Sequence, residues 1–353
     1  KFITEFVEEL PHVLVVDTYG CALSKESERL VVKRKTEVLE EAPLMDLEQV
    51  LVLSPAMVVS TEALRSCAER GIPIHFLATN GEPYATVLST NLTGTVQTRR
   101  EQLLAYEDER GVTLAKAFAL GKMQNQLTLL RYLVKNRRAK QPELHAHVTE
   151  AVRCINDMII ELREVEASRV DDLRPRLFSC EGRAAEHYWN AVRLLLTEEA
   201  GFLGREGRGA QDLTNSLLNY GYGVLYGTVQ RAVVLAGLDP FGGFIHVDRP
   251  GKPSLVLDMV EEFRQMVVDR TVVAMLNLGM PLELDDDGRL TVATRRLLVD
   301  KLNERLETPE PYTGSGGGRD RRKVKSIVVA QARRVAAFVR GQVETYEAYL
   351  GRW

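Results

Sequence analysis

The fold class is decided by residues 100–136, REQLLAYEDERGVTLAKAFALGKMQNQLTLLRYLVKN, because the pattern of apolar residues changes there. Its apolar residues recur at intervals of three and four, which is the period of an amphipathic helix. The same period dominates the rest of the chain, at residues 143–162, 184–196, 213–236, 255–276, 294–307 and 324–350. These patterns predict a large, nearly all-α domain at residues 99–353.

The chain before this stretch has a different pattern. Short runs rich in β-branched residues, typical of strands, lie at residues 12–35, 46–54, 72–78 and 81–89. Between them the segment STEALRSCAERG predicts one helix, in which Ser60 and Thr61 are N-cap candidates and Gly71 marks the end. The fold class is therefore predicted as α+β. A small β-rich N-terminal domain at residues 1–90 and a linker at residues 91–98 precede the helical domain.

Composition bounds the possible functions. The chain has 353 residues, 45% hydrophobic and 27% charged, which is ordinary for a globular protein of two domains. Its net charge of −3 means that any nucleic-acid partner must be held by local basic patches. Its 4 cysteines form no CxxC pair, so we expect reduced thiols in the cytoplasm and no zinc or iron–sulfur ligation. No apolar run is long enough for a transmembrane helix, so no membrane is expected.

A first candidate site lies in GFIHVDRPGKPSLVLDMVEEF, residues 243–263. The prolines and glycine in its middle exclude a helix there, and Ser254 is a plausible N-cap for the helix that follows. Asp258 and Glu261 share one face of that helix, and the turn could bring His246 beside them. Two carboxylates and an imidazole suit a divalent cation, with tolerance of Mn²⁺ beside Mg²⁺. The alternative is a solvated acidic helix start favoured by the helix dipole.

Other segments carry weaker signals. Glu181 is placed where an irregular segment becomes a helix, beside small and aromatic residues, and the alternative is an N-terminal charge on a core helix. Asn215 and Asn219 share a helical face that could contact phosphates or pack against neighbouring helices. Two basic clusters, at residues 131–140 and in the glycine-rich segment 314–325, could follow phosphates or be solvated faces.

Three motifs in order closely resemble the CRISPR-associated integrases of spacer acquisition, the Cas1 family. They are CEGRAAEHYW at 180–189, LTNSLLNYGYGVLYG at 213–227 and AGLDPFGGFIHVDRPGKPSLVLDMVEEFR at 236–264. Residues 59–85 look like the end of that family's β-rich domain, and residues 100–133 look like the entry to its helical domain. The resemblance covers most of the chain and implies the same two-domain architecture as the residue patterns.

The resemblance also implies a metal site. The family's glutamate in the EG motif, histidine after the GF dipeptide and acidic residue on the next helix fall here on Glu181, His246 and Glu261. Many relatives have aspartate at the last position, so the ligating oxygen of the longer Glu261 is left open. Asp258, one turn earlier, matches a further acidic position beside the metal and is included among the catalytic residues. The implied cofactor is Mg²⁺ or Mn²⁺.

Further residues are expected to contact DNA. Five of them stand on or near matching motif positions: Tyr188, Asn215, Asn219, Lys252 and Arg264. Four come from the basic clusters and would hold phosphates without reading bases: Arg137, Arg138, Arg321 and Arg322.

The family's activity implies the partners of this chain. Its members insert prespacer DNA into a CRISPR repeat by attack of a 3′-OH on a phosphodiester, and nick DNA when water attacks instead. They form homodimers that flank a dimer of the small ferredoxin-like protein Cas2, and some are fused to the iron–sulfur nuclease Cas4. The first residue, Lys1, is not Met, which leaves room for such a fusion. The alternatives are a transposon-borne integrase, a non-catalytic DNA-binding scaffold and a metal phosphohydrolase for small molecules.

Overall fold

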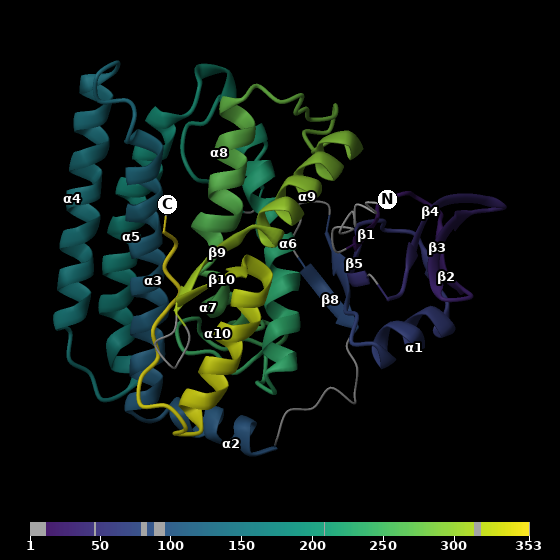
Figure 1. Cartoon of the computed structure of the whole chain (residues 1–353), viewed down its shortest axis with the longest axis horizontal. Helices are drawn as coiled ribbons and strands as arrows, with labels where there is room; N and C mark the ends of the chain where they lie inside the picture. The colour runs from purple at the N-terminus through teal and green to yellow at the C-terminus, as the bar shows by residue number, and fades with distance from the viewer. Residues whose placement is uncertain are drawn as a thin grey trace, which may run out of the picture.

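The computed structural model describes residues 12–45, 47–78, 83–87, 96–207, 209–313 and 319–352. Most strands gather at the N-terminal end of the molecule and helices form most of the rest, as the α+β prediction requires (Figure 1). Most of the predicted linker lies outside the described residues, so the predicted domain boundary stays a prediction. Within the described residues no helix is long and apolar enough to cross a membrane.

The N-terminal strands form two four-stranded sheets in the described part of the chain, in the orders β1-β5-β7-β8 and β4-β3-β2-β6. The first sheet consists of β1 (His12–Val16), β5 (Leu47–Val52), β7 (Ile74–Leu77) and β8 (Pro83–Val87). The second consists of β2 (Ala22–Glu26), β3 (Arg29–Arg34), β4 (Glu37–Pro43) and β6 (Val58–Val59). The first three strands of the first sheet are parallel and β8 is antiparallel, so α1 (Thr61–Glu69) forms part of the crossover between β5 and β7.

Local signals in this domain are confirmed. The side chain of Ser60 caps α1 by accepting a hydrogen bond from the Ala63 N–H at 3.1 Å. Gly71 follows the helix with a φ of +68°, a left-handed conformation that favours glycine. Strand β4 was not expected, because three of the seven residues in its sequence EVLEEAP are glutamates, a residue type that is uncommon in strands. Its place at the edge of a sheet explains why charged residues are tolerated there.

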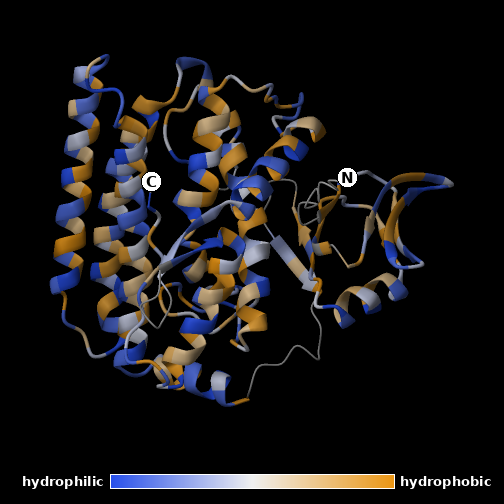
Figure 2. Ribbon diagram, viewed as in Figure 1, coloured by the Kyte–Doolittle hydropathy of each residue, from blue (hydrophilic) through white to orange (hydrophobic). Residues whose placement is uncertain are grey.

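The remaining elements confirm the largely helical second part. Its long helices are α2 (Val96–Ala105), α3 (Glu109–Val134), α4 (Pro142–Glu164), α5 (Val170–Leu195) and α6 (Leu213–Leu235). The later elements are α7 (Ser254–Val260), a π-helical turn (Gln265–Asp269), α8 (Arg270–Asn277), α9 (Val292–Glu307), β9 (Pro309–Thr313), β10 (Arg319–Lys323) and α10 (Val324–Val339). The outer helices α4 and α5 mix hydrophobic and hydrophilic residues along their length, which is typical of helices with one buried side (Figure 2).

Two local predictions are wrong. Glu181 does not begin a helix but lies in the middle of the 26-residue helix α5, which continues through Pro175 and Gly182 because buried residues recur along its whole length. Ser254 is the first residue of α7 rather than its N-cap, a place taken by Pro253. In the basic segment, Arg319–Lys323 form β10, which pairs antiparallel with β9, a pair that was not expected from the sequence.

The long periodic stretch that opens the helical part forms two helices rather than one. Helix α2 ends at Ala105, and Asp108 begins α3 by accepting a hydrogen bond from the Arg110 N–H at 2.9 Å. The apolar period persists across this break, which is why periodicity alone did not reveal it.

Helix α6 supports both halves of the molecule. Figure 1 shows it between the helices α3 to α5 and the strand β8. Gly227 of α6 faces the buried side chains of Gln49 and His75 from the first sheet. The ring of His75 lies 3.0 Å from the Thr86 hydroxyl, which donates to Gln230 Oε1 of α6 at 3.2 Å. Burial lowers the pKa of His75 to about 4, so this polar contact between the two parts uses a neutral imidazole.

Replacing Gly227 with alanine is expected to lower the free energy of unfolding by about 1–3 kcal/mol, because the new methyl group overpacks this contact. A Cβ there would lie 2.5 Å from Gln49 Oε1 and 2.9 Å from His75 Cδ2. Chemical denaturation measures the effect. The control is Gly182→Ala in α5, where a Cβ meets nothing within 4 Å and a gain of about 0.5–1 kcal/mol is expected. Equal stability of the two variants would mean that Gln49 and His75 can move away from the new methyl group at no cost, which would contradict the prediction.

A segment after α10 returns to the centre of the helical part. The side-chain amide of Asn125 in α3 donates to the carbonyls of Glu262 at 2.8 Å and Tyr349 at 2.9 Å, and accepts from the Gly351 N–H at 2.9 Å. The buried carboxylate of Glu262 accepts hydrogen bonds from the Tyr346 hydroxyl and, at 2.9 Å, from the Tyr349 N–H. Burial raises the pKa of Glu262 to about 7. The segment is thus fastened to the residue that follows Glu261.

Candidate metal and DNA site

The loop between α6 and α7 is held by two neighbouring helices. Gln102 of α2 is buried; its amide donates to the carbonyls of Asp239 at 2.8 Å and Gly242 at 2.7 Å. Its carbonyl accepts from the Asp239 N–H at 2.7 Å. Arg174 of α5 donates from Nε to the Ile245 carbonyl at 3.0 Å. The backbone next to His246 therefore has a defined position although it forms no regular structure.

Asp258 of α7 completes this hold and orients His246. Its buried carboxylate accepts the backbone N–H groups of Phe244 at 2.5 Å, Ile245 at 3.0 Å and His246 at 3.1 Å. The same carboxylate lies 2.7 Å from His246 Nδ1. A proton on Nδ1 is favoured by this contact, which leaves the lone pair of Nε2 for another partner. Asp258 thus orients the His246 ring through Nδ1 and does not itself face the group that would bind Nε2.

Gly243 allows the close approach that this arrangement needs. A Cβ on this residue would lie 2.5 Å from the Ser254 Cβ and 2.9 Å from Asp258 Oδ2. The GF dipeptide before His246 therefore has a physical role, because only glycine lets the loop lie against the start of α7.

Glu181 and Glu261 are brought together from distant parts of the chain. The ammonium group of Lys122 in α3 contacts the Glu181 carboxylate and lies 2.9 Å from Glu261 Oε2. Arg264 lies 3.4 Å from the other oxygen of Glu261. The side chains of Lys122, Glu181 and Glu261 are 12%, 18% and 5% exposed, so the cluster is largely shielded from water. Lys122 was not anticipated from the sequence, where it is a single charge in an apolar helix.

Electrostatics keep Glu261 ionised in this cluster. Burial alone would raise its pKa, but the positive charges of Arg264 and Lys122 outweigh burial and lower the pKa to about 2. His246 makes a smaller contribution in the same direction. The pKa of Lys122 is raised: burial opposes its charge, but Glu261 and Glu181 favour it. Glu261 is therefore an anion that needs a cation beside it.

The donor set fits a divalent cation, although the side chains stand around Lys122. Two carboxylates and one imidazole with a directed lone pair are ligands suited to Mn²⁺ and Mg²⁺. In the described residues, no three or more His, Cys, Asp or Glu side chains are arranged to hold a metal as they stand. Lys122 explains this, because its ammonium group occupies the position between Glu181 and Glu261.

A cavity of about 580 Å³ adjoins this cluster. Its wall includes Val260 and Arg264, which flank Glu261 in the sequence. The guanidinium of Arg264 lies 4.6 Å from the ring centre of Tyr222, and that of Arg205 lies 5.5 Å from the same ring. The other charged lining side chains are those of Arg249 and Lys252. A cavity lined by cations and aromatic rings suits phosphates and bases.

The structure gives the predicted DNA-contact residues of α5 and α6 different roles. Tyr188 is fully buried and donates to Asp269 at 2.7 Å, which rules out direct contact with DNA in this conformation. Asn215 is also buried; its carbonyl oxygen accepts from Arg205 at 3.0 Å. Asn219 lines the cavity and accepts from Arg205 at 2.6 Å. These amides position Arg205, which sequence reasoning missed.

The predicted basic clusters are not part of this cavity. Arg137 is half-buried and donates to the Leu195 carbonyl at 3.4 Å, and Arg138 is exposed beside it. Both lie beyond the end of α3, about 20 Å along the axis from Lys122. Arg321 and Arg322 are exposed on β10, and Arg322 lines a different groove. By contrast, Lys252 and Arg264 lie in the cavity wall.

The thiols match the expectation of reduced cysteines. Cys21, Cys67 and Cys180 are buried and Cys154 is half-buried, and all four are free. Burial raises the pKa of Cys67 to about 11, so it is an unreactive core residue.

Comparison with solved structures shows the same fold. A casposase bound to its integration product superposes with a TM-score of 0.79 at 23% identity, covering 96% of this chain and 94% of that one. A Cas1 protein from Thermotoga maritima superposes with a TM-score of 0.74 at 19% identity, covering 97% and 100%.

Sequence comparison is more specific. A CRISPR-associated endonuclease Cas1 of Archaeoglobus fulgidus is 40% identical over 351 residues, which cover 96% of this chain and 99% of that protein. One from Thermus thermophilus is 34% identical, covering 94% of each chain. The family model described as CRISPR associated protein Cas1 matches residues 14–304. The chain therefore belongs to the Cas1 family of CRISPR-associated proteins.

Proposed function

We propose that this protein is a metal-dependent DNA integrase and endonuclease that inserts prespacer DNA into a CRISPR array. The observation that carries the proposal is the convergence of Glu181 and Glu261, from α5 and the end of α7, on one cation position, with His246 held nearby by Asp258. Full-length similarity to proteins named CRISPR-associated endonucleases supports it.

Glu181, His246 and Glu261 would hold Mg²⁺ or Mn²⁺. When bound, such a cation neutralises phosphate charge and lowers the pKa of a hydroxyl beside it. Asp258 keeps the His246 ring oriented, and the positive charges of Arg264 and Lys122 keep Glu261 ionised against the effect of burial.

Several groups are placed to bind the substrate. Arg205, Arg249, Lys252 and Arg264 would bind phosphates in the adjoining cavity. Burial, and then the charge of Arg249, lowers the pKa of Lys252, so an incoming phosphate would relieve repulsion there. The cavity would thus hold the DNA strand next to the phosphodiester that is exchanged.

The proposed partners are double-stranded DNA, a second copy of this chain and Cas2. One solved structure with this fold is a Cas6-RT-Cas1–Cas2 complex, which superposes with a TM-score of 0.72 at 20% identity. A transposon-type integrase is the second candidate, because the casposase shares the fold. The CRISPR role is favoured, since relatives that are 31–40% identical are named as CRISPR-associated endonucleases.

A joining assay tests the proposal. Purified protein is mixed with labelled prespacer and supercoiled DNA carrying a CRISPR repeat, with and without Cas2, in Mg²⁺, Mn²⁺ or chelator. We expect joined product with either metal and none with chelator, since two carboxylates repel a DNA phosphate unless a divalent cation lies between them. Equal joining in chelator would contradict the metal site. Joining without preference for the repeat, even with Cas2 present, would favour the transposon-type integrase.

A further inference from the structure

A second groove lies away from the candidate catalytic cavity. It has a volume of about 720 Å³ and lies along the outer side of α10, next to α6 and the strand pair β9–β10. Its positively charged lining residues are Arg231, Arg322, Lys325, Arg333 and Arg334. Gln49, Thr228, Tyr312 and Ser326 add amide and hydroxyl groups. No carboxylate is among the described residues that line it.

Helix α6 separates the two hollows. Its residues Asn219, Tyr222, Gly223 and Tyr226 line the candidate catalytic cavity, whereas Thr228, Arg231 and Ala232 line the second groove. At about 100° per residue these two sets point in roughly opposite directions from the helix axis. The second groove is therefore a separate surface and not an extension of the metal site.

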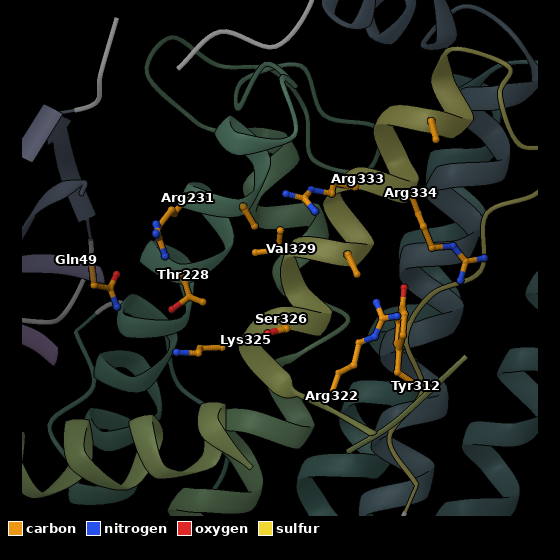
Figure 3. A pocket seen from close by; sticks show the side chains of 13 residues that line it. Gln49, Thr228, Arg231, Tyr312, Arg322, Lys325, Ser326, Val329, Arg333 and Arg334 are labelled. Carbon is orange, nitrogen blue, oxygen red and sulfur yellow. The ribbon is translucent and has the colours of Figure 1, made fainter. Parts of the chain in front are cut away.

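The cations are spread along the groove instead of meeting at one point. Figure 3 shows Arg231 and Lys325 on one side of it, and Arg322 and Arg334 on the other. On α10, Lys325 and Arg333 are eight residues apart, about 12 Å along the axis. That length equals the rise of about three to four base pairs in one strand of B-form DNA. This spacing suits an extended polyanion better than a single phosphate ion.

Ion pairs within the protein neutralise only some of the positive charges that line the groove. Lys325 pairs with Glu307 at 2.5 Å, and Arg322 pairs with Asp320 at 2.8 Å while lying 5.0 Å from the Tyr312 ring. Arg231 differs, because its Nε is buried and has no hydrogen-bond partner in the described part of the chain. A buried donor without a partner costs free energy, so an anion that reaches it is favoured.

We propose that this groove binds the sugar–phosphate backbone of a DNA segment other than the one at the metal site. Arg231 and Arg333 are the main contacts, and the hydroxyls of Thr228 and Ser326 add hydrogen bonds to phosphate oxygens. Contacts of this kind fix position without reading sequence. A joining enzyme must hold two DNA segments at once, and two basic hollows on opposite sides of one helix provide for that. The inference rests on the proposed function only in one respect, the identity of the DNA segment that the groove binds.

The salt dependence of DNA binding tests the groove. The variant Arg231→Gln/Arg333→Gln removes two cations and keeps hydrogen-bonding side chains. Binding of labelled double-stranded DNA is measured by fluorescence anisotropy over a range of salt concentrations. We expect the slope of log affinity against log salt to fall by about 1.8, because each phosphate contact contributes about 0.9. Arg231→Lys/Arg333→Lys should restore the slope, which separates lost charge from lost folding.

The matched control is Arg193→Gln/Arg296→Gln, which removes two exposed arginines outside the groove and should leave the slope unchanged. An equal slope for groove variant and wild type would overturn the proposal. So would competition by inorganic phosphate at matched ionic strength, which would indicate a small-anion site. Loss of Cas2 binding with DNA binding intact would assign the groove to a protein. If the wild-type protein joins no DNA in any metal, the proposed function fails. If the groove variant still lowers the salt slope in that case, the proposal that the groove binds DNA is retained.

Discussion

Replacing His246 with alanine is expected to reduce DNA joining about 10³-fold while leaving the fold intact. Loss of a metal ligand removes several kcal/mol of charge stabilisation, and about 4 kcal/mol corresponds to this factor. His246 is half-buried on a loop that is held mainly through its backbone, so truncation of the ring does not remove that hold. Glu181→Gln is expected to have a similar effect, measured as joined product in the presence of Mn²⁺.

Two comparisons sharpen this result. Asp258→Asn should cost about 10- to 100-fold, because the ring of His246 remains but loses the carboxylate that orients it. His147→Ala removes an exposed histidine of α4 and should retain full activity. If His246→Ala and His147→Ala join DNA equally well, the assignment of His246 as a ligand is wrong.

Replacing Lys122 with methionine is expected to lower the free energy of unfolding by about 3–5 kcal/mol in the absence of divalent metal. The substitution removes the cation that Glu181 and the nearly buried Glu261 share and leaves Arg264, 3.4 Å from Glu261, as the remaining counter-charge. Breaking a buried ion pair by removing one partner carries a cost of this size. Chemical denaturation with chelator present measures the loss. Added Mn²⁺ should restore more stability in the variant than in wild type, because the metal can take the position of the ammonium group.

Controls separate this effect from lost packing. Lys301→Met breaks a surface pair with Glu304 and should cost less than about 1 kcal/mol. The double variant Lys122→Met/Glu261→Gln should be more stable than Lys122→Met, since it removes the charge that lost this partner. If Lys122→Met unfolds with the same denaturant midpoint as the wild-type protein, Lys122 does not hold the two carboxylates.

Sequence periodicity predicted the fold class and most elements because those depend on local pattern. Strands β1, β5 and β7 and the helices α1 and α4 follow apolar spacing that can be read directly. The β9–β10 pair could not be read, because it is short and β10 consists of charged residues, RDRRK.

The candidate site could be predicted only in part. The motif resemblance identified Glu181, His246 and Glu261, and the structure brings the first and third together. Lys122 and Arg205 were missed, because a single lysine or arginine gives no signal until distant segments meet. Tyr188 lies within a motif, but its side chain is buried and donates to Asp269, a place that the motif did not indicate.

The hydrogen bonds that join Asn125 and Glu262 to residues 349–351 make the support of the candidate site depend on a late part of the chain. Gly351 donates to Asn125, which lies 226 positions earlier in the chain and itself donates to the carbonyl of Glu262, the residue after Glu261. A ribosome-bound chain that has not yet emerged beyond α10 lacks this support. The support behind Glu261 is thus expected to be complete only when residues 346–351 have docked.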